Sequence, residues 1–333
     1  MAKKTTLRIG LIGYIDSLAE NLRASLVLAL KGDEDAIHDA RVATRRLKAV
    51  IDLFAGQLSE RMKSKFGKSL KRIRRSLGTL RDIDVMIEHA GKMAASDAMA
   101  AAHLKEHLRG KRRKELAKIA ELDAAKLLSR LGSWWGLRSQ IKQEAAQPLL
   151  QASLRLQLEQ FCALADLHSA DKNALPPLVA EPADDTEPGT SIELNPHDMR
   201  IAGKALRYTL EMALEDSTKI PAGVIQTFKR MQEMLGLWHD HVVLVSTIMK
   251  VSVDTELGYR NPDLLKRNLK LAQAAARRAE LRLLDFVKLW RKQGAELQRQ
   301  ITAAIDQASE PAAAPDAALS EPAVIATPVV AAT

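Results

Sequence analysis

Residues 38–48 read HDARVATRRLK, and residues 197–207 read HDMRIAGKALR. Each stretch opens with a histidine-aspartate pair and continues with basic residues three, seven and ten positions after the histidine. The two sets correspond at a constant offset of 159 residues: His38, Arg41, Arg45 and Lys48 in the first stretch, and His197, Arg200, Lys204 and Arg207 in the second.

A second match lies downstream of each stretch. Leu77-Gly78 with Leu80-Arg81-Asp82 corresponds to Leu235-Gly236 with Trp238-His239-Asp240, at an offset of 158. Self-similarity over such a period indicates an internal duplication. Ala, Leu, Lys, Arg, Glu and Gln are abundant and aromatic residues make up 4% of the chain, which favours helices over strands. We therefore predict an all-α fold of two antiparallel four-helix bundles related by a pseudo-twofold axis.

Helical periodicity divides the folded part, residues 1–306, into two halves. The first half, residues 1–170, has helical patterns over 4–30, 34–56, 59–77, 80–91, 97–120 and 145–169. The second half, residues 197–306, has them over 197–215, 220–235, 238–250 and 262–300. Glycines stand where a helix could end or bend: Gly32, Gly78, Gly91, Gly236 and Gly294. Residues 171–196 are rich in proline and acids and are predicted to be a linker, and residues 307–333 to be a disordered Ala/Pro tail.

The net charge of +9 is unevenly distributed. Residues 1–170 carry +12 and residues 197–306 carry +5, whereas the linker carries −5 and the tail −3. The segments expected to fold are therefore strongly basic. A field of this sign attracts polyanions such as nucleic acid, anionic lipid or polyphosphate, without distinguishing among them.

The basic residues of the first stretch share one face of the predicted helix. At 100° per residue they fall within about 80° of each other, and the apolar residues occupy another face. Like charges at this spacing repel, so two such stripes in register favour a binding role over a solvated face whose nearby acids offset the charge. The next helix adds Lys71 and Arg74, and Lys229 repeats Lys71 in the second half.

Phosphate chains suit such stripes. Arginine presents a planar fork that can bind two phosphate oxygens, lysine adds a point charge, and a protonated histidine donates from both ring nitrogens. A polymer with one negative charge per phosphate binds several of these groups at once and releases counterions. Inorganic polyphosphate, or a similar long polyanion, is the predicted ligand, and nonspecific binding of nucleic acid is an alternative.

These motifs resemble those of a known family. His38 to Lys48 with Leu77 to Val85, and the corresponding pieces of the second half, resemble the signature of the CHAD family, the conserved-histidine α-helical domains. The resemblance spans roughly residues 5–300. It implies two four-helix bundles around a basic pore or groove, polyphosphate binding, and association with polyphosphate granules. Arg46 and Arg81 also fall within these motifs and join the predicted site. Ala205 replaces Arg46 in the second repeat, which reduces its charge.

Three patterns argue for catalysis, and each has a simpler explanation. His103, Glu106 and His107 match H-x-x-E-H, but basic neighbours from Lys105 to Arg113 disfavour a dication and indicate a solvated basic helix. His-Asp pairs occur three times, as in metal-dependent phosphohydrolases, the main enzymatic alternative, yet arginine follows two of them on the same face. Asp82 and Asp84 are expected to cap a helix or to pair with Arg81. No phosphate-binding glycine loop is present. We predict a binding protein without cofactor or metal rather than an enzyme.

The remaining features are structural or concern location. Cys162 is the single cysteine and lies in an apolar stretch, where a packed core residue is expected. Trp134, Trp135 and Trp238 are also expected to pack rather than to stack on bases. No apolar run approaches the roughly 20 residues needed to span a bilayer. Without a recognisable signal peptide, the chain is expected to be cytoplasmic, in association with polyphosphate granules.

Overall fold

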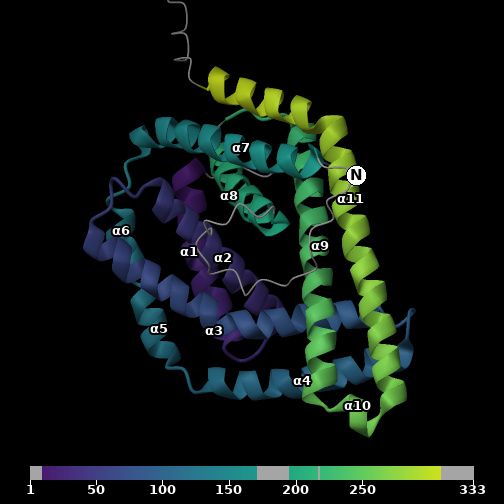
Figure 1. Ribbon diagram of the computed structural model, residues 1–333. Helices are drawn as coiled ribbons and strands as arrows, with labels where there is room; N and C mark the ends of the chain where they lie inside the picture. The colour runs from purple at the N-terminus through teal and green to yellow at the C-terminus, as the bar shows by residue number, and fades with distance from the viewer. Residues whose placement is uncertain (1–9, 171–194, 217, 309–333) are drawn as a thin grey trace, which may run out of the picture.

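The computed structural model describes residues 10–170, 195–216 and 218–308, and every regular element in these ranges is a helix (Figure 1). The all-α class is thus confirmed. The first half contains α1 (Gly10–Ala29), α2 (Glu34–Leu53), α3 (Glu60–Lys92), α4 (Ala98–Ala120), α5 (Ala124–Leu131), α6 (Trp134–Arg138), η1 (Gln143–Ala145) and α7 (Ala146–Ala170). The second half contains α8 (Pro196–Glu215), α9 (Ala222–Asp254), α10 (Leu257–Arg260) and α11 (Pro262–Gln307).

Side-chain caps define where several helices begin. Asp33 accepts a hydrogen bond from the Ala36 N–H at 2.8 Å and starts α2, and Asn195 accepts one from the His197 N–H at 2.9 Å and starts α8. Such caps satisfy backbone donors that have no partner inside the helix. Both basic stretches therefore begin at the first turns of capped helices.

Consecutive helices pack against each other in both halves. α1 contacts α2, α2 contacts α3 and α3 contacts α4, while α7 contacts α8, α8 contacts α9 and α9 contacts α11. The corresponding helices also match in length, since α2 and α8 have 20 residues each and α3 and α9 have 33. This shared order is what a duplication would produce, and the pseudo-twofold relation between two bundles stays a prediction.

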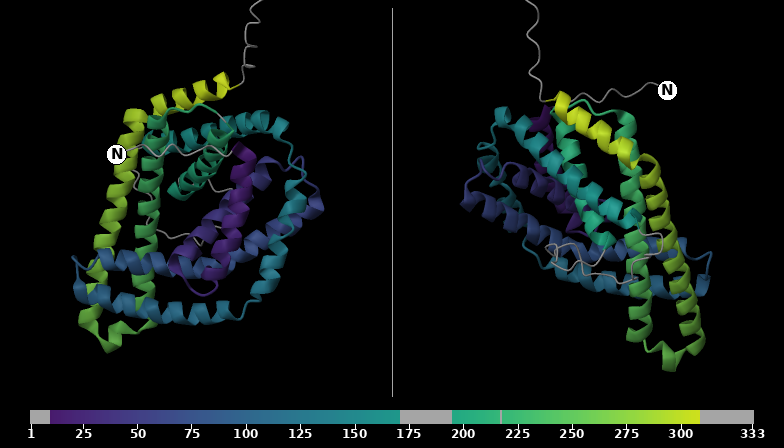
Figure 2. Two further views of the ribbon diagram at one scale, coloured as in Figure 1. Left: turned by 180° about the vertical axis from the view of Figure 1, so that it is seen from behind. Right: turned by 45° about the horizontal axis from the view of Figure 1, so that its top comes forward.

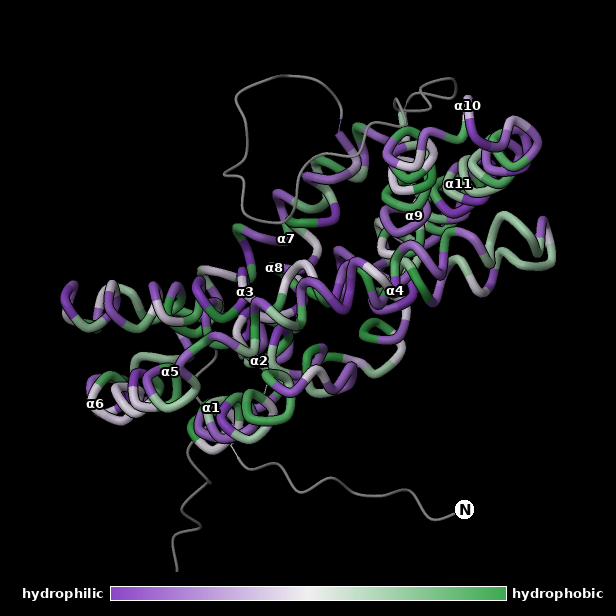
Figure 3. The backbone as a smooth tube through the Cα atoms, turned by 90° about the horizontal axis from the view of Figure 1, so that it is seen from below, coloured by the Kyte–Doolittle hydropathy of each residue, from purple (hydrophilic) through white to green (hydrophobic). Residues whose placement is uncertain are grey.

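The core does not divide at the boundary between the halves. The larger cluster of buried apolar side chains draws on α1, α2 and α3 and also on α7, α8, α9 and α11. A second cluster lies where the α3–α4 hairpin crosses the α9–α11 hairpin (Figure 2). Hydrophobic and hydrophilic residues alternate along the helices, as amphipathic packing requires (Figure 3). The two halves consequently stabilise each other.

Two predicted helix breaks are wrong. Residues 59–77 and 80–91 belong to one helix, α3, and residues 220–235 and 238–250 belong to α9. Gly78 and Gly236 lie inside these helices, as Gly294 does inside α11. A glycine within a helix costs only about 1 kcal/mol, which the tertiary packing of a 33-residue helix outweighs.

The segments that connect or end the helices differ in part from the prediction. Short helices α5 and α6 occupy a stretch for which no helix was predicted, and α11 continues to Gln307 rather than ending at 300. Pro196, predicted to be the last linker residue, is the first residue of α8. The rest of the predicted linker to residue 194 and the predicted tail from residue 309 lie outside the described residues.

The predicted basic face of α4 is not wholly solvated. Arg112 donates its Nε–H to Asp84 at 2.5 Å and an Nη–H to the Gly32 carbonyl at 2.8 Å. The Asp84 side chain is only 2% exposed and lies within α3, so it caps no helix. Removing one partner of such a pair would leave a buried charge without its counterion. Arg112 is therefore structural.

The predictions that the cysteine and the tryptophans pack in the core are largely confirmed. Cys162, Trp134 and Trp238 are buried, whereas Trp135 is exposed and does not pack as expected. Within the described ranges, no helix is both long and apolar enough to cross a membrane.

Candidate functional site

The two basic stretches lie on helices that touch. α2 carries three distinct faces, with the predicted basic stripe on one, core residues such as Ala40 and Leu47 on another, and Asp35 and Asp39 on the third. α2 contacts both α3 and α8, and α3 contacts α9. The stripes of the two halves are thereby brought to one region of the molecule.

Arg41 is the most buried cation of the first stripe. Its side chain is buried, donates to the Arg74 carbonyl at 3.4 Å and lies 3.5 Å from the Asp82 carboxylate. A Cβ at Gly78 would stand 2.7 Å from the Arg41 Nη1, so a larger residue there would require the guanidinium to shift. Burial lowers the pKa of Arg41 to about 10, with the Asp82 charge opposing and three neighbouring arginines adding to the shift.

Arg200 and Lys204 are the corresponding cations of the second half. Arg200 is buried and lies 3.4 Å from the His239 Nε2, and burial lowers its pKa to about 10, reinforced by Arg45 of the first stripe. Burial also lowers the pKa of Lys204 well below its ordinary value, with Arg200, Arg45 and Arg41 adding to the effect. The cations of the two halves therefore lie close enough to repel one another.

Histidines and one carboxylate line the α9 side of this region. The Asp240 carboxylate lies 3.4 Å from the His89 Nε2, and the His239 ring lies 5.4 Å from that of His197. Burial and then Arg200 lower the pKa of His239 to about 3, so the ring is neutral at pH 7. The Arg200 guanidinium then donates to the His239 Nε2. Desolvation and then Arg81 lower the pKa of His38, which places that ring beside the same group of cations.

We call the cations joined by these interactions the basic cluster. It comprises six residues from three helices: Arg41, Arg45, Arg74, Arg81, Arg200 and Lys204. Gathering cations away from water lowers stability, and such perturbed groups concentrate at functional sites. The arrangement can neutralise several negative charges of one ligand.

Arg46 and Arg207 meet at a different point. Both donate an Nε–H to Glu211, Arg46 at 2.8 Å and Arg207 at 3.0 Å, and the Tyr14 hydroxyl lies 3.5 Å from the same carboxylate. Arg46 points away from the stripe, as its position on the helix predicts. Glu211 thus joins one predicted site residue from each half.

Comparison with known proteins defines the family. A family model described as the CHAD domain matches residues 13–248, which is more than half of the chain. This chain belongs to the CHAD family. The match ends within α9 and is therefore shorter than the predicted span of 5–300. No curated protein matches the chain.

Solved structures agree on the fold of this CHAD protein. A crystal structure of the CHAD domain from the plant Ricinus communis is 17% identical, with a TM-score of 0.54, and the alignment covers 89% of this chain and 90% of that chain. PptA from Streptomyces chartreusis is 16% identical, with a TM-score of 0.52 and coverage of 89% and 98%. At such identities the likeness concerns the fold alone.

Some predicted site residues of the CHAD protein lie apart from the basic cluster. Lys48 pairs with Asp52 on the surface of α2. Lys71 and Lys229 are exposed on α3 and α9, and neither forms a hydrogen bond or ion pair among the described residues. Asp82 caps no helix and instead faces Arg41. The basic cluster therefore includes fewer residues of α2 than the basic stripe that the sequence predicts.

The sequence did not single out Glu211 or His89. Glu211 lies four residues after Arg207, a spacing that favours an ion pair on one helix, so one of its contacts was available from the sequence. Its contact with Arg46 crosses 165 residues. His89 lies on the α3 face of Asp82, seven residues later, but its partner Asp240 is on α9. Contacts between distant helices leave no local signal.

The motifs considered for catalysis do not converge. Glu106 lies 3.9 Å from Arg109 and 3.8 Å from Arg113, and Asp39 lies on a different face of α2 from His38. Among the described residues, no group of three or more His, Cys, Asp or Glu side chains is placed to hold a metal ion.

Proposed function

We propose that this CHAD protein binds inorganic polyphosphate, or a polyanion of similar charge density, without catalysing its hydrolysis. The observation that carries the proposal is the basic cluster, which unites Arg41 and Arg45 of α2 with Arg200 and Lys204 of α8. Burial and neighbouring cations lower the pKa values of Arg41, Arg200 and Lys204, so a bound anion would relieve their repulsion. Burial also reduces the screening of each contact by salt.

A chain ligand explains the geometry better than a single phosphate. Six cations spread over α2, α3 and α8 exceed what one phosphate group can contact, whereas successive groups of a chain can reach several in turn. Family membership supports a polyphosphate ligand and association with polyphosphate granules. Arginines three residues after His38 and His197, on the face where a metal site would need carboxylates, favour binding over metal-dependent hydrolysis.

The first prediction compares two arginine pairs on the same helix. Arg74 and Arg81 share the face of α3 that meets the basic cluster, whereas Arg61 and Arg72 are exposed on its opposite face. Arg74→Gln with Arg81→Gln should weaken polyphosphate binding by about 2 kcal/mol or more, about 30-fold, because each loses a charge-assisted contact. Arg61→Gln with Arg72→Gln removes the same charge and should change affinity several-fold less, in titrations at fixed salt.

Substitutions of Arg41 and Arg112 are unsuitable for this comparison. Arg41 is buried and Arg112 is structural, so losing either would confound binding with folding. If both α3 double variants lose the same affinity for polyphosphate, binding depends on the overall positive charge of the protein and not on a defined site. Competition with duplex DNA at the same salt tests the nucleic-acid alternative, which gains support if DNA displaces polyphosphate at equal phosphate concentration. Release of orthophosphate during the titration would contradict the non-catalytic part of the proposal.

A further inference from the structure

One carboxylate holds two arginines at the junction of the two halves. Glu211 on α8 is 20% exposed and accepts from Arg46 of α2 and Arg207 of α8. The Tyr14 hydroxyl of α1 lies 3.5 Å away. Two guanidinium groups within 3.0 Å of the same carboxylate must lie near each other, and their charges exceed that of Glu211.

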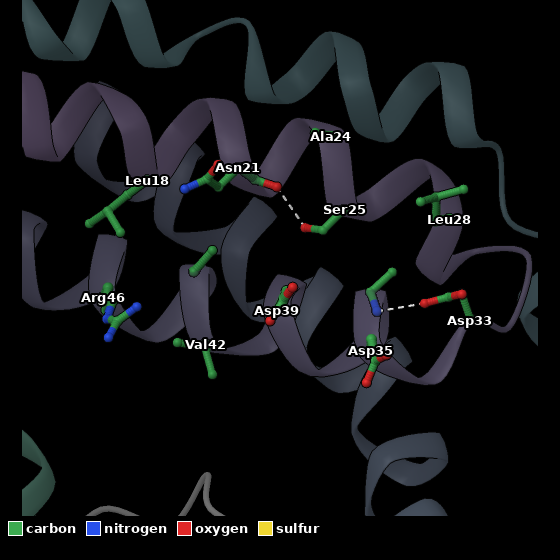
Figure 4. A pocket seen from close by; sticks show the side chains of 12 residues that line it. Leu18, Asn21, Ala24, Ser25, Leu28, Asp33, Asp35, Asp39, Val42 and Arg46 are labelled. Atoms are coloured by element: carbon green, nitrogen blue, oxygen red, sulfur yellow. Dashed lines mark hydrogen bonds between the residues drawn. The ribbon is translucent and has the colours of Figure 1, made fainter. Parts of the chain in front are cut away.

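Both arginines keep donors for a second anion. Each binds Glu211 through Nε–H, and among the described residues their Nη groups form no hydrogen bond. Their side chains are 28% and 40% exposed. Figure 4 shows Arg46 at one end of a groove of about 540 Å³ between α1 and α2, so it is not enclosed by the core. Asp35 and Asp39 farther along this groove disfavour a polyanion there.

The pair lies on two of the helices that carry the basic cluster, although Arg46 points away from the stripe on α2. Arg46 follows Arg45 directly, and Arg207 lies three residues after Lys204 on α8. A phosphoryl group and a carboxylate use the same fork of guanidinium donors, so a ligand reaching this point competes with Glu211. For a single small anion, the competition with Glu211 lowers the affinity, because such an anion makes no further contacts that offset it. A chain already held by the basic cluster presents its next phosphates at high effective concentration.

We infer that Glu211 is an internal counter-anion that positions Arg46 and Arg207 as a second phosphoryl-binding point and restricts that point to long chains. The inference rests on the proposed polyphosphate binding. Glu211 acts here on specificity, through the two arginines, rather than by touching the ligand.

The test is Glu211→Gln, with tripolyphosphate and long-chain polyphosphate as probes. The amide keeps the shape but removes the competing charge. Tripolyphosphate affinity should rise about 10-fold, and long-chain affinity should rise less, because the chain already overcomes the competition. For tripolyphosphate, the slope of log affinity against log salt should steepen by about 1 to 2, as two further cations become available. Glu159→Gln, the same charge change at an exposed site on α7, should alter neither the chain-length preference nor the slope.

The outcomes separate this inference from the proposed function. If the wild type binds long chains and Glu211→Gln leaves the chain-length preference unchanged, the inference fails and the function stands. If the wild type binds no polyphosphate of either length, the proposed function fails, and the inference that rests on it fails as well. Should Glu211→Gln not fold, Arg46→Gln with Arg207→Gln replaces it. That variant must weaken long-chain binding and spare tripolyphosphate, and the opposite order overturns the inference.

Discussion

Burial at single residues sets the protonation of the candidate site. It lowers the pKa of Arg41 and Arg200 to about 10, so both remain charged at pH 7, and lowers that of His239 to about 3, so its ring is neutral. The neutral ring can accept a hydrogen bond from Arg200, which a protonated ring could not. The histidine therefore orients an arginine while adding no charge to the cluster.

Stability should depend on pH through this histidine. Its pKa of about 3 in the folded state lies below the ordinary value of 6.5, so its contribution is complete above pH 6.5 and is lost as pH falls toward 3. One such group contributes a slope of up to about 1.4 kcal/mol per pH unit. His239→Gln should therefore reduce the loss of unfolding free energy between about pH 7.5 and pH 5 by up to about 2 kcal/mol, measured by urea unfolding. An unchanged pH dependence would show that the ring titrates normally.

At the scale of elements, the sequence predicted where most helices lie but not their continuity. α2, α4, α7 and α8 occur within a few residues of their expected bounds, since each has a clear apolar stripe or a cap. α3 and α9 were divided at Gly78 and Gly236, because a glycine is a local signal whereas the packing that carries a helix through it is not. Gly78 does not break the helix; its missing side chain lets the Arg41 guanidinium lie close to the α3 backbone.

The two helix glycines should respond differently to alanine. Nothing lies within 4 Å of a Cβ built at Gly236, so Gly236→Ala should stabilise the protein by about 0.5–1 kcal/mol through helix propensity. At Gly78 the added Cβ would displace the Arg41 guanidinium from Asp82. Gly78→Ala should thus give no such gain and should weaken polyphosphate binding. Denaturant unfolding and titration of both variants check this, and equal stabilisation by both would contradict the close approach.

For the whole molecule, the sequence repeat identified which residues recur and not how the halves meet. Eight of the predicted site residues gather around one region: His38, Arg41, Arg45, Arg74, Arg81, His197, Arg200 and Lys204. Their convergence depends on α2 contacting α8 and on α3 contacting α9. Helix periodicity gives the face on which a side chain lies but not the partner of that face. The contact between Glu211 and Arg46, which joins α8 to α2, could therefore not be predicted from the sequence.

The shared core predicts that the first half is not stable alone. Ile83, Met86 and Leu104 of α3 and α4 pack in one cluster with Leu244 and Ile248 of α9. Leaving such side chains exposed forfeits about 1.5–3 kcal/mol each, and a few of them account for the whole net stability of a typical domain, about 5–15 kcal/mol.

A fragment of residues 1–170 should therefore unfold without a cooperative transition in a denaturant titration followed by circular dichroism, whereas the full chain should show one. Adding a fragment of residues 195–308 should restore helicity and polyphosphate binding together, because the core draws on α8 and α9 and the basic cluster draws on α8. Cooperative unfolding of 1–170 at the midpoint of the full chain would instead make each half an independent bundle. In that case the duplication would have produced two domains that share only their ligand.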